Sequence, residues 1–246
     1  MRLCGDVNSE VKGKKVSNIA ENIRRVKERM EAAARRVGRN PEEIRLVAVS
    51  KTVPPEVIAA LRPLAPVVLG ENRVQEAQAK LPLLPGPDVF RWHLIGHLQS
   101  NKVNRAVELF ETIHSVDRLE LLQRLNRRCG ETGRRLRVLL EVNLGGESSK
   151  SGCVEEEVVP LLEAACSLPH LIVDGFMTIP PYRQDPEEVR PYFRRLREIR
   201  DRLAGRFEGA LPLRELSMGM SHDFEVAIQE GATLVRVGTA IFGARL

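Results

Sequence analysis

The chain has 246 residues, of which 43% are hydrophobic and only 4% are aromatic. This length and composition suit one α/β domain with a core of Leu, Val, Ile and Ala. The 38 basic and 33 acidic residues give a net charge of +5, and arginines mix with glutamates in helical segments such as residues 190–206. Such mixing indicates solvated helix faces with ion pairs and argues against a nucleic-acid surface, which would need interleaved aromatic residues.

No stretch of the sequence is typical of a membrane span or an export signal, because a span needs about 20 consecutive apolar residues. Residues 1–15 are polar, and we expect them to form a flexible tail. The cysteines lack CxxC spacing and lack histidines at metal-ligand intervals, so we expect no metal site and reduced thiols. The cysteines are Cys4, Cys129, Cys153 and Cys166. These features predict a cytoplasmic protein.

Apolar residues recur with helical spacing over residues 16–37, which predicts a first helix that ends at Gly38. After this helix, short apolar runs alternate regularly with amphipathic segments. The eight expected strands are 44–51, 67–72, 92–98, 112–116, 136–144, 171–179, 215–220 and 233–237. The helices expected between and after them are 55–62, 74–81, 101–109, 118–132, 155–167, 186–203 and 222–230.

Strands that alternate with helices predict parallel βαβ units, and the number eight favours a closed TIM (β/α)8 barrel. We expect residues 16–246 to form this barrel as one domain, with the extra N-terminal helix packed outside the barrel or across its bottom. An open, doubly wound sheet is the alternative, because periodicity alone does not show closure.

Lys51 stands at the end of the first expected strand, and Pro54 and Pro55 stop the strand directly afterwards. One interpretation is a surface lysine that happens to follow a strand. The other is an amine held partly out of water, where its pKa falls and it can form a Schiff base. The position favours the second interpretation only if other polar groups meet at the same end of the barrel.

Polar residues at the ends of the last two expected strands indicate an anion site, since barrels commonly bind phosphate there. Ser221 stands just before a helix, where it suits an anion or acts as a plain N-cap. Gly238 allows close approach of a ligand, and Thr239 adds a hydroxyl and an amide. Arg236 lies two residues before Gly238 and therefore points into the barrel mouth, where a guanidinium needs an acid or a ligand.

At these positions the sequence resembles the pyridoxal phosphate homeostasis protein family. That family's barrel is similar to the N-terminal domain of alanine racemases, the fold type III group of pyridoxal-phosphate proteins. The matching motifs are VAVSKT at 47–52, GENRVQE at 70–76, WHLIGHLQSNK at 92–102, LSMGMSHD at 216–223 and VRVGTAIFG at 235–243.

The resemblance implies that the chain binds pyridoxal 5′-phosphate (PLP). The positions that match the family's cofactor site are Lys51, Asn72, Met218, Ser221, Arg236, Gly238 and Thr239. The lysine would carry the Schiff base, and the serine, glycine and threonine would hold the phosphate. Arg236 would face the pyridine nitrogen and keep it unprotonated, which makes the cofactor a weaker electron sink. The asparagine and the methionine would lie near the ring.

The resemblance favours a protein of intracellular PLP (vitamin B6) homeostasis, which holds PLP without robust catalysis and supplies it to PLP-dependent apoenzymes. The alternative is a PLP-dependent amino-acid racemase. Alanine racemases use a tyrosine from a second domain opposite the lysine, and we expect no second domain after Leu246. The tyrosines here are Tyr182, a weak candidate, and Tyr192, in a helix expected outside the barrel. Without racemase-like dimer contacts we expect a monomer. A nucleic-acid or protein-interaction module is a remote alternative based on charge alone.

Overall fold

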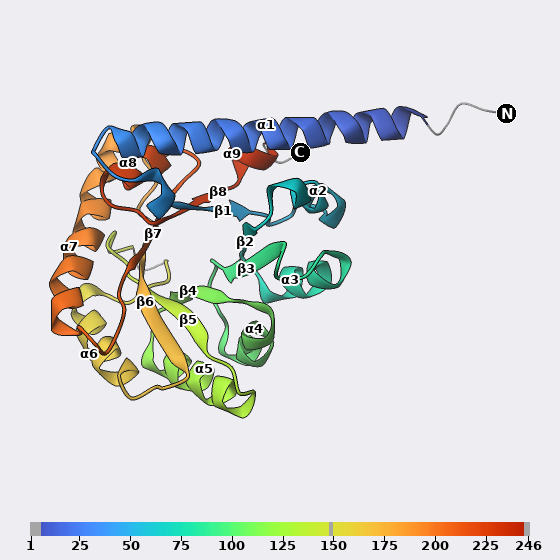
Figure 1. Cartoon of the computed structure of the whole chain (residues 1–246). Helices are drawn as coiled ribbons and strands as arrows, with labels where there is room; N and C mark the ends of the chain where they lie inside the picture. Colours follow the sequence, from blue (N-terminus) through green and yellow to red (C-terminus); the bar gives the residue numbers. More distant parts are fainter. Residues whose placement is uncertain (1–5, 148–149, 244–246) are drawn as a thin grey trace.

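Eight parallel strands close into a barrel in the order in which they occur along the chain (Figure 1). The computed structural model describes residues 6–147 and 150–243, and for residues 6–18 the backbone alone. The strands are β1 (Arg45–Val49), β2 (Val67–Glu71), β3 (Phe90–Leu94), β4 (Thr112–Val116), β5 (Leu136–Glu141), β6 (Leu171–Met177), β7 (Glu215–Met220) and β8 (Leu234–Val237). Because β1 pairs with β8 in parallel, the predicted TIM barrel is confirmed and the open sheet is excluded.

The helices of the outer ring follow the strands as expected. They are α2 (Pro55–Ala59), α3 (Val74–Lys80), α4 (Val103–Leu109), α5 (Leu119–Glu131), α6 (Glu155–Ala165), α7 (Arg190–Arg206), α8 (Phe224–Gln229) and α9 (Thr239–Phe242). Short 3-10 turns occupy Pro41–Glu43, Arg62–Leu64, Leu81–Leu83, Ser100–Lys102 and Pro186–Val189. Most strands end earlier than expected, because their apolar runs continue into the loops at the barrel mouth.

Helix α1 (Asp6–Arg35) begins ten residues before the expected start, so it covers most of the segment for which a tail was expected; residues 1–5 lie outside the described residues. The helix lies outside the barrel, against α8 and α9 (Figure 1). Asn22 Nδ2 donates to the carbonyl of Ile241 at 2.8 Å, and Arg29 pairs with Glu225 at 2.9 Å. The long helix therefore covers the barrel wall where β8 is followed only by the four-residue α9.

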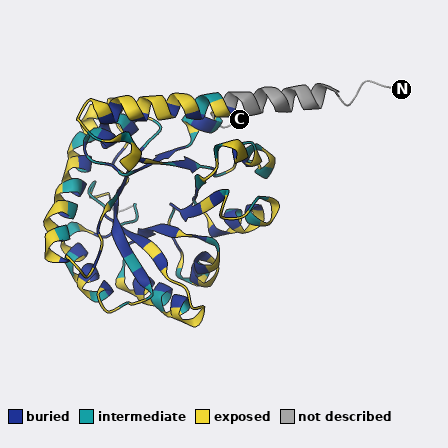
Figure 2. Cartoon of the chain, in the orientation of Figure 1, coloured by how far each residue is buried: buried dark blue, intermediate teal, exposed yellow. Residues whose placement is uncertain are grey.

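Apolar side chains form two layers, one between strands and helices and one inside the barrel. The colours of Figure 2 show the buried strands surrounded by helices whose outer faces are exposed. The inner layer consists of Val47, Ile95, Leu139, Met177 and Leu234. Because this inner layer is small, much of the barrel interior is left for polar groups, and buried polar groups require hydrogen-bond partners.

The described cysteines are free thiols, with Cys129 and Cys153 buried and Cys166 exposed; Cys4 lies outside the described residues. Burial raises the pKa of the Cys153 thiol to about 12, and burial also raises the pKa of Cys129. Both buried thiols therefore stay protonated and unreactive. Within residues 6–147 and 150–243, no helix is long and apolar enough to cross a membrane.

Gly175 in β6 is required by a close approach between strands. Its φ is +152°, and a Cβ added there would lie 1.9 Å from the carbonyl oxygen of Glu215. We expect Gly175→Ala to lower the free energy of unfolding by about 3 kcal/mol or more in urea titrations, because strain and overpacking add. The matched variant Gly38→Ala has φ +69° and no atom within 4 Å, so it should cost only about 1–2 kcal/mol. Equal losses in the two variants would show that the contact does not matter.

Candidate functional site

Lys51 and Gly238 lie just after two neighbouring strands, β1 and β8, at the carboxyl end of the barrel. The register pairs Ala48 of β1 with Val237 of β8, so the next residues, Val49 and Gly238, are also adjacent. A Cβ added to Gly238 would lie 3.3 Å from Val49 Cβ, which leaves little room for a side chain. Lys51 follows Val49 by two residues, and its side chain is half-buried. The predicted Schiff-base lysine and the predicted phosphate residues therefore share one rim.

Ser221 contacts the same rim from the end of β7. The Gly238 amide donates a hydrogen bond to Ser221 Oγ at 3.2 Å, which joins the loops after the seventh and eighth strands. Thr239 follows as the first residue of α9 and is exposed. The hydroxyls of Ser221 and Thr239 and the main-chain amides at the start of α9 thus lie at the same end of the barrel, and hydroxyls and amides are donors that can bind a phosphate group.

Arg236 is enclosed in the barrel directly beneath this rim, with 3% of its surface exposed. Its Nη1 donates to Ser217 Oγ at 2.7 Å and its Nη2 donates to the carbonyl of Thr178 at 3.0 Å. Burial lowers the pKa of Arg236 to about 10, while Asp223 and Glu141 act in the opposite direction. The guanidinium stays protonated at neutral pH, yet it forms no ion pair within 4.0 Å with any described carboxylate.

The hydrogen bonds of Arg236 continue through the barrel interior to its other end. Ser217 Oγ lies 2.9 Å from His114 Nδ1, and His114 Nε2 lies 2.9 Å from His93 Nδ1. His93 lines a cavity of about 310 Å³ at the amino ends of the strands. Thr178, Arg236, Ser217, His114 and His93 therefore form one chain from the barrel mouth to its bottom.

The donor at the mouth determines the proton positions along this chain. Arginine only donates, so Ser217 accepts from Arg236 and satisfies its own hydroxyl proton by donating to His114 Nδ1. His114 then carries its proton on Nε2 and donates to His93 Nδ1, which places the His93 proton on Nε2. These tautomers follow from the network, because the opposite direction would leave a buried hydroxyl unsatisfied.

The backbone on both sides of Lys51 is held by side chains outside the barrel. Thr52 has a left-handed φ of +62°, and its amide donates to Glu76 Oε2 at 3.1 Å. Ser50 is fully buried; its hydroxyl donates to Glu71 Oε1 at 2.7 Å and its carbonyl accepts from Lys80 Nζ at 2.7 Å. The conformation of this loop, unusual for threonine, is therefore determined by its contacts with β2 and α3.

A buried ion pair lies at the centre of these contacts. Lys80 Nζ is 2.8 Å from Glu71 Oε1, and both side chains are buried. Burial is the main cause that raises the pKa of Glu71, against the hydrogen bonds from Lys80 and Ser50. Glu71 Oε2 is buried and accepts no hydrogen bond from the described residues. The pair is costly to bury, and removal of one partner should be far more harmful than removal of both.

Asn72 directly follows Glu71 at the same rim and is half-buried. Gly96, in the loop after β3, packs on its backbone, because a Cβ added to Gly96 would lie 2.4 Å from the Asn72 carbonyl oxygen. Only glycine fits this approach. The structure thus holds Asn72 from the β3 side, at a position compatible with the role that the resemblance implies.

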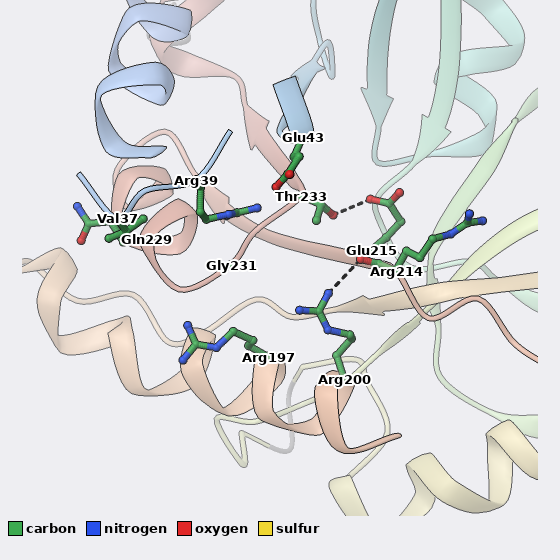
Figure 3. Close-up of a pocket in the computed structure, with 10 residues that line it drawn as sticks. All are labelled: Val37, Arg39, Glu43, Arg197, Arg200, Arg214, Glu215, Gln229, Gly231 and Thr233. Atoms are coloured by element: carbon green, nitrogen blue, oxygen red, sulfur yellow. Dashed lines mark hydrogen bonds between the residues drawn. The ribbon is translucent and has the colours of Figure 1, made fainter. Parts of the chain in front are cut away.

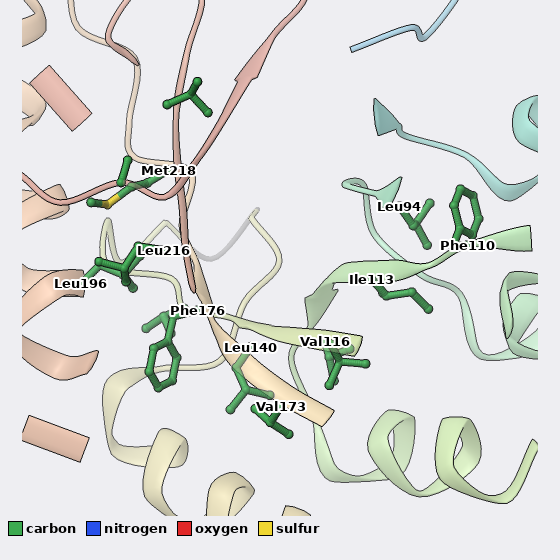
Figure 4. Close-up of a cluster of buried hydrophobic side chains, with 14 of the residues drawn as sticks. Leu94, Phe110, Ile113, Val116, Leu140, Val173, Phe176, Leu196, Leu216 and Met218 are labelled. Atoms are coloured by element: carbon green, nitrogen blue, oxygen red, sulfur yellow. The ribbon is translucent and has the colours of Figure 1, made fainter. Parts of the chain in front are cut away.

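Met218 is placed differently from the expectation. Its side chain is fully buried in the layer between strands and helices, and Figure 4 shows it near Leu216 and Leu196 of α7. The reason is strand alternation: Ser217 points into the barrel, so its neighbour Met218 points outward. Met218 therefore does not offer its side chain to a ligand at the rim.

Several residues around the site were not assigned a role from the sequence. The spacing of Glu76 and Lys80 on one helix face, four residues apart, was a usable signal. His93 and His114 occupy adjacent strands, but their contact depends on strand stagger. Glu141, at the end of β5, has a pKa raised to about 7, first by burial and then by Asp117. Only the fold reveals that this carboxyl is enclosed.

The residues present fit a phosphorylated pyridine aldehyde. A phosphate suits the donors of Ser221, Gly238 and Thr239, and an unprotonated ring nitrogen suits the donor-only guanidinium of Arg236. A protonated ring nitrogen would instead require a carboxylate at the position of Arg236.

Fold and rim define the class of barrels represented by the alanine racemase N-terminal domain, whose family model matches residues 15–246. Within that class, the chain belongs to the pyridoxal phosphate homeostasis protein family. The relative of that name from Aquifex aeolicus is 49% identical over 228 residues, which cover 93% of this chain and 99% of the relative. This membership confirms the resemblance drawn from the motifs.

Comparison with solved structures separates relatives from proteins that share only the fold. PipY of Synechococcus elongatus, solved with PLP bound, is 37% identical with a TM-score of 0.80, and the match covers 92% of this chain and all of PipY. An alanine racemase from Clostridium difficile is 17% identical with a TM-score of 0.66, and the match covers 93% of this chain and 57% of the racemase. The racemase comparison therefore shows the fold alone.

The tautomers and charge states of the buried histidines can be measured by NMR. Burial lowers the pKa of His93 to about 3 and lowers that of His114 well below its usual value. We expect both ring nitrogens named Nδ1 to show unprotonated ¹⁵N shifts, and the ring signals to stay constant from about pH 8 to pH 5. Since the unfolded chain binds these protons below about pH 6.5, each histidine should cost about 1.4 kcal/mol of stability per pH unit of further acidification. A midpoint near pH 6.5 for either residue would contradict the network.

A double-mutant cycle tests the buried pair beside Lys51. Lys80→Met leaves the Glu71 carboxyl buried without its partner, so we expect a loss of about 3–5 kcal/mol in the free energy of unfolding. Adding Glu71→Gln to Lys80→Met removes the charge and should recover at least about 1 kcal/mol. Urea unfolding of the two single variants and the double variant measures this coupling. Strictly additive losses would mean that the two groups do not interact.

Proposed function

We propose that the chain binds PLP at the carboxyl rim of its barrel, through a Schiff base with Lys51, and takes part in PLP homeostasis without robust catalysis. The observation that carries the proposal is the convergence of Lys51, the Ser221–Gly238 contact and the buried Arg236 on one end of the barrel. PipY, a relative at 37% identity, was solved with PLP bound, which supports the same ligand for this chain.

Each residue has a defined task in this proposal. Ser221, Gly238 and Thr239 bind the phosphate and so orient the ligand, while Arg236 donates to the ring nitrogen. The contacts of Ser50 and Thr52 hold the Lys51 backbone in position from outside the barrel. When bound, PLP supplies an electron sink, and an arginine partner at the ring nitrogen keeps that sink weak. A weak sink suits storage and transfer better than turnover.

A racemase activity remains the alternative function, and tyrosine placement argues against it. Tyr182 is 74% exposed, with its ring 5.6 Å from that of His222, so solvent surrounds the only tyrosine near the rim. Tyr192 packs against the layer outside the barrel. A group that exchanges a proton with substrate opposite Lys51 would have to be shielded and to lie at the rim; Tyr182 is exposed, and Tyr192 lies outside the barrel.

The finer features of the function are proposals of the same kind. PLP-dependent apoenzymes are the proposed recipients of the cofactor, the cytoplasm is the proposed compartment, and a monomer is the proposed state. Recipients could be identified by measuring whether PLP-loaded protein reactivates an apoenzyme faster than the same amount of free PLP. Equal rates would argue against direct transfer.

Reduction with borohydride followed by mass spectrometry tests the binding proposal directly. Purified chain incubated with PLP should gain one reduced phosphopyridoxyl group on Lys51, together with visible absorption before reduction. Lys51→Ala should lose both signals, whereas Arg236→Lys should retain the adduct and shift the absorption, because a compact ammonium replaces the planar guanidinium donor near the ring nitrogen. Failure of the wild-type chain to form the adduct at saturating PLP would overturn the proposal, and steady interconversion of D- and L-alanine would favour the racemase.

A further inference from the structure

A cavity lies at the opposite end of the barrel from Lys51. It has a volume of about 640 Å³ and opens between α7, the segment joining α1 to β1, and the starts of β7 and β8 (Figure 3). Its charged lining residues are Arg39, Arg197, Arg200, Arg214, Glu43 and Glu215. Pockets of about 300–1,000 Å³ accommodate small molecules, so this volume is sufficient for a ligand.

The acidic residues of the lining do not balance its arginines. The lining holds four arginines and two glutamates, and Glu215 is already paired with Arg45 and accepts from Thr233 Oγ1 at 2.6 Å. Three of the arginines, Arg197, Arg200 and Arg214, pair with carboxylates that do not line the cavity. Glu43 is exposed at the margin. Among the described residues, Arg39 is thus the lining arginine that no carboxylate pairs with, and its positive charge attracts anions.

Arg39 is the least compensated of these arginines. Its Nη1 donates to the carbonyls of Ile228 at 2.7 Å and Ala232 at 2.9 Å, which fixes the guanidinium in place. It forms no ion pair with any described residue, and its Nε and Nη2 make no hydrogen bond to them. Burial lowers the pKa of Arg39, Glu43 opposes this shift, and Arg200 and Arg197 lower the pKa further. A guanidinium that is fixed in place with unused donors is preorganised to bind an anion.

The neighbouring arginines present their groups to the same space. Figure 3 shows Arg39 and Arg200 on facing sides of the cavity, while the guanidinium of Arg214 points away. Arg200 donates to the carbonyl of Arg214 at 3.1 Å, and Arg197 pairs with Glu230 at 3.1 Å. Gly231 leaves room for Arg197, because a Cβ there would lie 3.0 Å from Arg197 Cδ. The cavity is thus built by two rigid elements, α7 and the α8–β8 turn.

We propose that this arginine-lined cavity binds a small molecule carrying two or more phosphate groups. Guanidinium groups match phosphate oxygens with paired hydrogen bonds, and the separate positions of Arg39 and Arg200 favour more than one anionic group. No aromatic side chain lines the cavity, so stacking on a base contributes nothing and the phosphates carry the binding. The inference is independent of PLP binding, because it concerns the other end of the barrel.

The probe is inorganic pyrophosphate, titrated calorimetrically into the full chain. The chain is first incubated with PLP and reduced with borohydride, so that the bound phosphopyridoxyl group keeps pyrophosphate away from the rim. We expect one saturable site whose affinity falls as salt rises. Arg39→Gln and Arg200→Gln should each weaken binding by about tenfold. Arg200→Gln keeps the test valid if Arg39→Gln does not fold, since Arg200 bonds only Asp201 and a main-chain oxygen of Arg214.

Arg195→Gln is the matched control, because Arg195 lies on the same helix and pairs with Glu155 away from the cavity. Its affinity should stay within about twofold of wild type, as expected for an exposed pair. No saturable binding, or equal losses in all three variants, would overturn the proposal. If no PLP adduct forms at the rim, pyrophosphate should still bind to the unreduced chain, and Arg39→Gln should still weaken that binding. Failure of PLP binding at the rim is therefore distinguishable from failure of pyrophosphate binding at the arginine-lined cavity.

Discussion

The enclosure of one guanidinium in the barrel interior is the constraint on which the rest of this structure depends. Arg236 is buried at the level where a ligand would meet the strand ends, and it has no described carboxylate within ion-pair distance. The barrel compensates with a line of neutral acceptors rather than an opposite charge. Because each acceptor must then be satisfied in turn, the interior contains serine and histidine at positions that usually hold Val, Ile or Leu.

The polar network inside the barrel and the Glu71–Lys80 ion pair outside it have different structural roles. The chain from Arg236 to His93 orients a cation toward the mouth while both imidazoles stay neutral. Glu71 and Lys80 instead lie outside the barrel wall, where they hold the backbone of Ser50 next to Lys51. In the proposed PLP complex, the first network would set the charge near the ring nitrogen, and the second would set the position of the Lys51 amine. Both are precise because they are attached to strands and helices rather than to loops.

The strand and helix periods were enough to predict the eightfold alternation, and closure followed once β1 was found beside β8. The motif positions also predicted that Lys51, Ser221 and Gly238 lie at one rim, and in the structure these residues lie there. Met218 was assigned to the site because a motif does not state which of two alternating side chains faces inward. The His93–His114 contact and the buried Lys80 depend on stagger and on helix rotation, which no short pattern specifies. The start of α1 was placed too late because polar residues extend a helix without any apolar period.

The position of α1 ties the order of synthesis to the completion of the barrel. This helix is made before the barrel, whereas its packing partners α8 and α9 are made after the other strands and helices, and the Asn22–Ile241 hydrogen bond spans 219 residues. A ribosome-bound chain therefore presents the apolar face of α1 without its native partners until α8 and α9 have been made. Contacts of such long range slow folding, since the ends must meet before the wall is sealed. A circularly permuted chain in which α9 is linked directly to α1 would convert the contacts between these two helices from long-range into local ones.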